Sequence, residues 1–241
     1  MTASTFPQLL AEQLRRSGAR PLVTFYDDAT GERVELSVVT YANWVAKTAG
    51  VLQEEVGAER GDAVLIDLPT HWLAPVWLGA CWSMGLGVTT DPAADSALVV
   101  CGPEGLERYA ATDRPVVALS LLPMGRRFAE PLPPGVIDFG VVVWGQPDSF
   151  VADDPPAPSD LAWLGPPART QEQLLESAAG GRWGATGTRL LTDVAPVSEP
   201  GLDAVIGPLA AGGGTVWVAS PDPTGWEHRV STEHATAKFT G

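Results

Sequence analysis

Four short apolar runs, separated by helical segments, constrain the fold of this chain more than any other feature. They are Ala63–Leu68, Ala97–Cys101, Val116–Ser120 and Val141–Trp144. Strands that are apolar on both faces and that alternate with helices are typical of a parallel sheet covered on both sides. We therefore expect an α/β fold, with a layered and mostly parallel sheet and helices on both of its faces.

Local patterns predict further elements in the first part of the chain. Apolar residues at helical spacing predict helices over Phe6–Ser17 and Tyr41–Val56, the second with Thr40 as its N-terminal cap. Two β-rich runs, Leu22–Tyr26 and Arg33–Leu36, are joined by a turn sequence and predict a hairpin. These elements fit the same α/β class.

The composition of residues 145–160 suggests a domain boundary. This segment is rich in Pro, Asp and Ser and lacks periodicity, which is typical of a linker or a long surface loop. It would separate an α/β N-terminal subdomain, residues 1–144, from a second small α/β segment, residues 161–241. The second segment has too few elements to be stable alone, so we expect it to pack on the first.

The charge balance excludes several partners. The chain has 29 Asp and Glu against 15 Lys and Arg, a net charge of −14 and a pI of about 4.5. Nucleic acids and anionic membranes are bound by clustered basic residues, so neither is expected as a partner. The uncharged stretch from Leu68 to Thr90 is interrupted by prolines and glycines, and its helical part is too short to span a bilayer. With no secretory signal in the first residues, we expect a cytoplasmic protein.

No residue type stands in a catalytic or metal-binding pattern. The three histidines, His71, His228 and His234, lack metal-ligand spacing. Cys81 and Cys101 lie in apolar surroundings, where a free cysteine behaves as a small hydrophobe. There is no nucleophile elbow of the G-x-S-x-G type. We therefore assign no catalytic residue and no metal site.

One candidate for ligand binding is the glycine-rich run from Gly180 to Arg189. Backbone amides in such loops can form an anion-binding nest, with Gly184, Thr186 and Thr188 as the candidate residues. A Walker loop would need a lysine, and the only lysines are Lys47 and Lys238. A simple loop that joins a helix to a strand is the alternative.

The order of segments from Phe25 to Pro92 resembles the N-terminal part of the adenylate-forming superfamily, the AMP-dependent acyl-CoA synthetases and ligases. The matching pieces are Thr40-Tyr41, Arg60-Gly61-Asp62, Leu68-Pro69-Thr70-His71, Gly85 to Val88 and Asp91-Pro92. A weaker likeness covers Arg189 to Gly241, and Asp160 to Trp163 resembles the strand that leads into the family's phosphate loop. The closest group is that of short, uncharacterised actinobacterial-type proteins with distant similarity to AMP-binding enzymes.

The resemblance fails where the family binds phosphate. The family has a Ser/Thr/Gly-rich loop ending in a lysine, whereas this chain has Leu164 to Thr170, with two prolines and no lysine or serine. Proline has no amide donor, so no phosphate ligand can be carried over. The resemblance implies ATP or AMP and CoA as cofactors, but we expect none of them here. The sequence ends at Gly241, before the segments that form the family's acyl pocket and lid.

We therefore expect a degenerate, non-catalytic relative that acts as a binding, regulatory or scaffold module. Exposed apolar surface and strand edges of a truncated sheet would then be covered by a protein partner or by a second copy. The first alternative is the structural half of a split or divergent adenylate-forming ligase. The second is an α/β protein unrelated to that family.

Overall fold

The structure is a computed structural model that describes residues 3–241, and of Ala179 only the backbone. The chain forms two compact units. The first contains residues 1–42, 69–75 and 172–241, and the second contains residues 43–68 and 76–171. Each unit is built around its own sheet, so the chain is α/β, as expected from the sequence.

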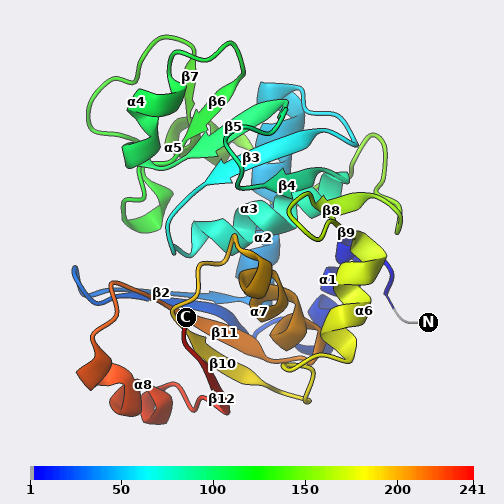
Figure 1. The fold of residues 1–241 in the computed structure, drawn as a ribbon, viewed down its shortest axis with the longest axis vertical. Coiled ribbons are helices and arrows are strands. Elements are labelled where there is room, and N and C mark those ends of the chain that lie inside the picture. Colours follow the sequence, from blue (N-terminus) through cyan, green and yellow to red (C-terminus); the bar gives the residue numbers. More distant parts are fainter. Residues whose placement is uncertain (1–2) are drawn as a thin grey trace. The chain divides into compact units, whose positions relative to one another are not determined.

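The first unit holds a five-stranded sheet in the order β12-β10-β11-β1-β2 (Figure 1). All neighbouring strands are parallel except β1 and β2, which form the expected antiparallel hairpin. The strands and helices of this unit are β1 (Pro21–Asp27), β2 (Glu32–Ser37), β10 (Arg189–Thr192), β11 (Gly214–Ala219), β12 (Ala237–Phe239), α1 (Phe6–Ser17), α6 (Gln171–Ala179, whose first residue belongs to the second unit), α7 (Glu199–Ala210) and α8 (Trp226–Thr232).

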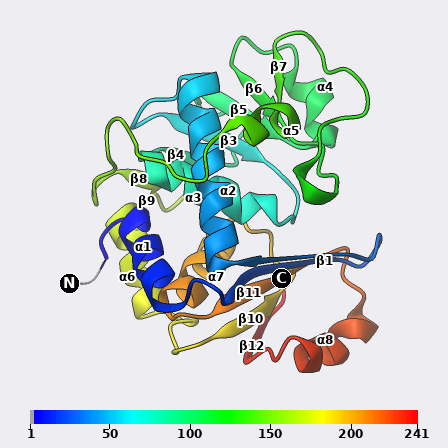
Figure 2. The ribbon, with the colours of Figure 1, turned by 180° about the vertical axis from the view of Figure 1, so that it is seen from behind.

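Helices α7 and α8 cover opposite faces of this sheet (Figures 1 and 2). On the α7 side, the Thr215 hydroxyl of β11 donates to the Ala204 carbonyl at 2.6 Å. On the α8 side, Trp226 packs with Leu191 and Val216 in a buried apolar cluster. Because side chains alternate along a strand, neighbouring residues 215 and 216 serve the two opposite faces.

The second unit holds a seven-stranded sheet in the order β7-β6-β5-β3-β4-β8-β9, parallel except for the pair β8 and β9. Its strands are β3 (Ala63–Asp67), β4 (Gly87–Thr89), β5 (Leu98–Cys101), β6 (Val116–Ala118), β7 (Val136–Asp138), β8 (Leu161–Trp163) and β9 (Arg169–Thr170). Its helices are α4 (Leu106–Tyr109), α5 (Phe139–Val142) and the π-helical turn η1 (Val51–Val56), while α2 (Val38–Gly50) and α3 (Leu73–Met84) include residues of both units.

The units do not follow the sequential division at residues 144 and 161 that the sequence suggested. Strands β8 and β9 belong to the seven-stranded sheet, whereas β10 to β12 join β1 and β2 in the other sheet. Residues 145–160 lie within the second unit and do not link the two. Parallel pairing causes this interleaving, since β1 pairs with β11 and β4 pairs with β8 across long sequence separations.

Two local predictions were wrong. The apolar run Val141–Trp144 is helical, because the Asp138 carboxylate accepts the Gly140 amide at 3.0 Å and caps α5; β7 ends at Asp138. Helix α2 starts at Val38, and its cap is Ser37, whose hydroxyl accepts the Thr40 amide at 3.1 Å. In both places a polar side chain just upstream sets the helix start.

Candidate functional site

The glycine-rich run joins α6 to β10 and uses several of its polar groups internally. The Gly184 amide donates to the Gly181 carbonyl at 3.2 Å. The amide and the hydroxyl of Thr188 both donate to the Ala185 carbonyl, at 3.0 and 2.7 Å. Thr186 is exposed. Two of the three candidate residues therefore use these donors in hydrogen bonds within the loop. An anion site in this run stays a prediction.

The segment matched to the family's phosphate loop is a hairpin between β8 and β9. Leu161 pairs with Thr170, and Trp163 pairs with Arg169, so residues 164–168 form the turn. The Leu164 amide donates to the Val88 carbonyl at 2.9 Å. At Gly165 a Cβ atom would lie 2.5 Å from the Trp163 indole nitrogen. The indole ring thus packs tightly against this turn.

Neither lysine supplies the missing ammonium group. The Lys47 ammonium donates to the Gln146 carbonyl at 2.5 Å and lies 3.1 Å from an Asp148 carboxylate oxygen. Lys238 is on β12, in the first unit, where its ammonium is 3.5 Å from Glu227. Lys47 is thus engaged by residues 146 and 148, and Lys238 belongs to the other unit from the β8–β9 turn.

Two segments that carry the family resemblance meet in the second unit. The Arg60 guanidinium donates to both carboxylate oxygens of Asp160, at 2.7 and 2.8 Å. Gly85 has a φ of +73°, and a Cβ there would lie 2.7 Å from the Asp160 carboxylate and 2.9 Å from Arg60. This bidentate pair joins the turn before β3 to the start of β8.

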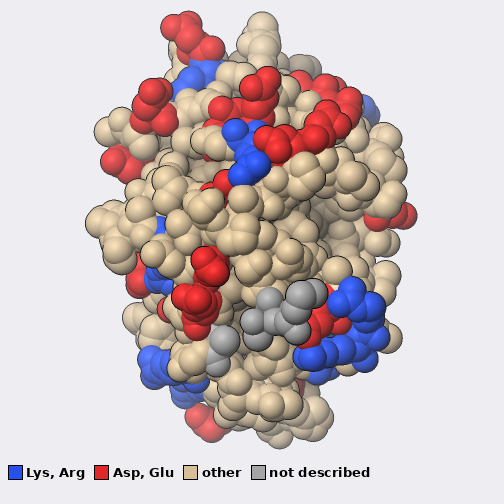
Figure 3. Space-filling view, turned by 90° about the vertical axis from the view of Figure 1, so that its right-hand side faces the viewer, with Lys and Arg blue, Asp and Glu red and all other residues tan. Residues whose placement is uncertain are grey.

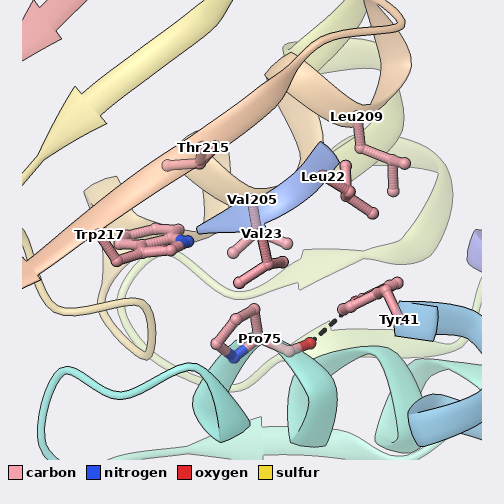
Figure 4. A pocket seen from close by; sticks show the side chains of 8 residues that line it. All are labelled: Leu22, Val23, Tyr41, Pro75, Val205, Leu209, Thr215 and Trp217. Atoms are coloured by element: carbon pink, nitrogen blue, oxygen red, sulfur yellow. Dashed lines mark hydrogen bonds between the residues drawn. The ribbon is translucent and has the colours of Figure 1, made fainter. Parts of the chain in front are cut away.

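One cavity in the first unit is too small for a ligand. It has a volume of about 10 Å³ and is lined by Leu22, Val23, Tyr41, Pro75, Val205, Leu209, Thr215 and Trp217 (Figure 4). The Tyr41 hydroxyl donates to the Pro75 carbonyl at 2.8 Å, and burial raises the pKa of Tyr41. Such a volume holds about one water molecule.

A second cavity of the first unit is open to the surface and has the volume of a ligand site. Its volume is about 510 Å³, within the range of small-molecule pockets. We call it the Arg–Glu cavity; it is lined by Arg20, Pro21, Tyr26, Arg33, Glu35, Gly187, Arg189, Gly213, Gly214, Thr232, Glu233 and His234. These residues come from the β1–β2 hairpin, the starts of β10 and β11, and the segment after α8.

The carboxylate of Glu233 organises the wall of this cavity. Its side chain is only 5% exposed, and Arg189 Nη2 donates to its Oε2 at 2.6 Å. Arg33 Nη2 donates to its Oε1 at 2.9 Å, and the Tyr26 hydroxyl donates to the same oxygen. Both carboxylate oxygens are thus held by charged or hydroxyl donors from three strands.

This network fixes protonation states. Burial raises the pKa of Glu233, but hydrogen bonds from Tyr26, Arg189 and Arg33 outweigh it, and the net pKa lies below the ordinary value of 4.5. Burial and the hydrogen bond to Glu233 raise the pKa of Tyr26. Glu233 is therefore an anion and Tyr26 a neutral phenol at neutral pH.

The cavity is rich in positive charge for so acidic a protein. Its lining carries three guanidinium groups, Arg20, Arg33 and Arg189, against the carboxylates of Glu35 and Glu233. On the face shown in Figure 3, basic side chains form small groups beside acidic ones and no broad basic patch. The Arg–Glu cavity thus concentrates a local excess of one positive charge in a chain whose net charge is −14.

Sequence reasoning did not single out the residues that build this cavity. In the sequence, Arg189 stands out only as the end of the glycine-rich run. The hairpin register offers a partial signal, since Thr24 pairs with Glu35 and Tyr26 with Arg33, which brings polar side chains to one face. The link to Glu233 spans a sequence separation of about 200 residues and leaves no local trace.

Two further searches concern metals and membranes. Within residues 3–241, no group of three or more His, Cys, Asp or Glu side chains is arranged to hold a metal ion. The helices of this described part are all too short or too polar to cross a bilayer.

Comparison with solved structures places the fold. The chain aligns with an acyl-CoA synthetase from Brucella canis at a TM-score of 0.75 and 19% identity, over 96% of this chain and 47% of that one. A mutant form of coronafacic acid ligase from Pectobacterium brasiliense gives 0.77 and 10% identity, over 98% and 50%. The N-terminal domain of FACL13 from Mycobacterium tuberculosis gives 0.73 and 14% identity, over 99% and 62%. The expected likeness to the N-terminal part of these ligases is confirmed for the fold.

The chain therefore spans about half the length of the first two of these structures. No family model matches it. A protein from Mycobacterium tuberculosis (strain ATCC 25618 / H37Rv), described as a TIGR03089 family protein, is 37% identical over 237 residues, which cover 95% of each chain. Identity of this degree over nearly the full length places the present chain in the same family: it belongs to the TIGR03089 family.

Proposed function

We propose that this protein is a non-catalytic relative of the adenylate-forming ligases and acts as a binding module. The β8–β9 turn carries the proposal. In place of a hydroxyl-rich loop ending in lysine, it has Pro166 and Pro167, and the Trp163 ring packs against it at Gly165. Adenylation depends on groups that position and neutralise phosphates, and no such set stands in this segment.

The purified protein is expected to show no ATP–pyrophosphate exchange with any member of a panel of short-, medium- and long-chain carboxylic and amino acids. The physical reason is that transition-state charge on the phosphates would meet no lysine at the β8–β9 turn. Exchange of radiolabelled pyrophosphate into ATP is the measurement, with an acyl-CoA synthetase of the same fold as the positive control.

Two variants guard this assay against contamination. Exchange that persists in Gly184→Ala and Thr186→Ala proteins at the wild-type rate comes from a contaminant or from another site. Exchange that these substitutions abolish would contradict the proposal, because it would assign phosphate binding to the glycine-rich run. In that case the chain would be a divergent ligase, or one half of a split ligase.

The proposal includes a cytoplasmic location and no nucleic-acid partner. The net charge of −14 supports the second point, since electrostatic binding to phosphate backbones needs an excess of basic residues. Fractionation of cells that express a tagged protein, with protease protection, tests the location.

A second candidate role, as a scaffold for a protein partner or a second copy, is favoured by exposed apolar side chains in the second unit. Val141, Trp144 and Met124 are 55%, 52% and 66% exposed. The Trp144 ring lies 5.5 Å from the Trp44 ring in an edge-on contact. Exposed apolar groups of this kind commonly mark interaction surfaces.

For this scaffold role we expect self-association in light scattering. The mass should exceed the monomer mass of 25.3 kDa at high concentration and should fall to it in a Trp144→Ser, Met124→Ser double variant. The matched control is Val151→Ser, which removes an exposed apolar side chain elsewhere in the unit. A monomer at all concentrations would contradict self-association through this surface, and the binding-module role would then be the one that we retain.

A further inference from the structure

We propose that the Arg–Glu cavity binds a small organic anion with a single negative charge. Its volume of about 510 Å³ is that of a site for a small molecule. The cavity lies wholly in the first unit, on the five-stranded sheet, and contains no residue of the β8–β9 turn. The inference therefore stands independently of whether the protein catalyses adenylation.

The first support is unused donor capacity in the cavity wall. Arg189 Nη1 and Arg20 Nε are buried and have no hydrogen-bond partner, although both residues line the cavity. A buried guanidinium donor without an acceptor is costly, and such atoms in a folded protein call for an explanation. An anion seated in the cavity supplies an acceptor for the Arg20 guanidinium after a small rotation of that side chain.

The second support is preorganisation. Glu233 and Thr24 accept hydrogen bonds from Arg189 Nη2 at 2.6 and 2.8 Å, so one edge of the guanidinium is fixed before any ligand arrives. Arg33 is likewise held by Tyr26 and Glu35, at 2.9 and 2.6 Å. Arginine forks that are already oriented lose little conformational entropy on binding a planar anion.

The charge count selects a monoanion. Three guanidinium groups and two carboxylates leave one positive charge, which a ligand with one negative charge neutralises. A phosphate monoester carries close to two negative charges at neutral pH, which is more than the one positive charge of the lining neutralises. The remaining negative charge would lie near the carboxylates of Glu35 and Glu233. Like charges in partly buried surroundings repel strongly, so a dianion is disfavoured relative to a monoanion of the same size.

The test uses benzoate as the monoanion, benzamide as its neutral counterpart of the same shape, and inorganic phosphate as the more highly charged anion. Titrations are followed by isothermal calorimetry and by saturation-transfer NMR on the intact protein. Benzoate is expected to bind saturably and more tightly than phosphate, while benzamide gives no saturable signal. Absence of saturable benzoate binding, or equal binding of benzamide, overturns the proposal.

Arg20→Gln is the informative variant, because Arg20 lines the cavity and its buried Nε has no hydrogen-bond partner in the described part of the chain. We expect it to weaken benzoate binding by about tenfold while leaving thermal unfolding unchanged. The matched control is Arg15→Gln, which removes the same charge from an exposed position on α1, outside the cavity. Equal losses in both variants would assign the effect to net charge and contradict a site.

The last part of the test is an expected gain of affinity for phosphate. Glu35→Gln removes one carboxylate and leaves two positive charges in the lining, so phosphate binding should strengthen by at least about threefold. A damaged fold cannot imitate tighter binding. Unchanged or weaker phosphate binding in this variant overturns the charge argument that selects the monoanion.

Discussion

Replacing Gly213 by Ala is expected to lower the free energy of unfolding by more than about 3 kcal/mol. A Cβ atom at this position would lie 1.8 Å from the Thr188 carbonyl oxygen and 2.6 Å from its carbon. That oxygen accepts the Gly214 amide at 3.0 Å, where β11 begins beside β10. The clash is with backbone, so it is relieved only by moving the start of β11 away from β10. Urea denaturation followed by circular dichroism measures the loss.

Gly225→Ala is the matched control in the same unit. Gly225 has a φ of −82°, which any residue adopts, and a Cβ there would meet no atom within 4 Å. We expect its unfolding free energy to stay within about 0.5 kcal/mol of the wild type. Similar losses for both variants would contradict the close approach at Gly213 as the cause, since Gly→Ala at a compatible backbone conformation does not destabilise through chain entropy.

This close approach also shapes the Arg–Glu cavity. Gly213 and Gly214 line it, and Gly187, another lining residue, donates its amide to the Ala211 carbonyl at 2.8 Å. The backbone of the glycine-rich run therefore packs directly against the backbone of the turn before β11. The sequence suggested a phosphate nest in the first of these segments. In the structure, these glycine positions form part of the floor of a cavity whose donors are guanidinium groups.

The fold was predictable because its signals are local. Buried strands of a parallel sheet are apolar on both faces, and β3, β5 and β6 were recognised from that pattern alone. The hairpin of β1 and β2 was recognised from its turn. The order of these elements then pointed to the right family of folds, even though the strands belong to two different sheets.

The run Val141–Trp144 shows where a local signal misleads. Four apolar residues fit a buried strand and a buried helix equally well. The decision came from Asp138, whose carboxylate caps the helix, and from Gly140, where a Cβ would lie 2.4 Å from the Arg127 amide nitrogen. Only the tertiary structure reveals that second contact.

The cavity could not be predicted from the sequence, because its polar and charged residues are far apart along the chain. Tyr26 and Glu233 are 207 residues apart, and Thr24 and Arg189 are 165 apart. No periodicity or motif connects these positions. The parallel pairing of β1 with β11 and of β11 with β10 brings them to one face of the sheet.

Glu233→Gln is expected to lower the free energy of unfolding at neutral pH by about 2–4 kcal/mol. The amide is nearly isosteric, but it leaves Arg189, whose side chain is 14% exposed, without a counter-charge. The control is Glu227→Gln on α8, where the carboxylate is 87% exposed and 3.5 Å from Lys238. Loss of so exposed a pair should not change stability measurably.

The pH dependence of that difference distinguishes a charge effect from a packing effect. The pKa of Glu233 is lower in the folded protein than its ordinary value of 4.5, so the carboxylate stabilises the fold fully above pH 4.5. As the pH falls through the folded pKa, the wild type takes up a proton there and loses this contribution, whereas the Gln variant has nothing to lose. Denaturation curves of the two proteins should therefore converge below pH 4.5. A gap that stays constant from neutral to acid pH would mean that shape, and not charge, makes Glu233 necessary.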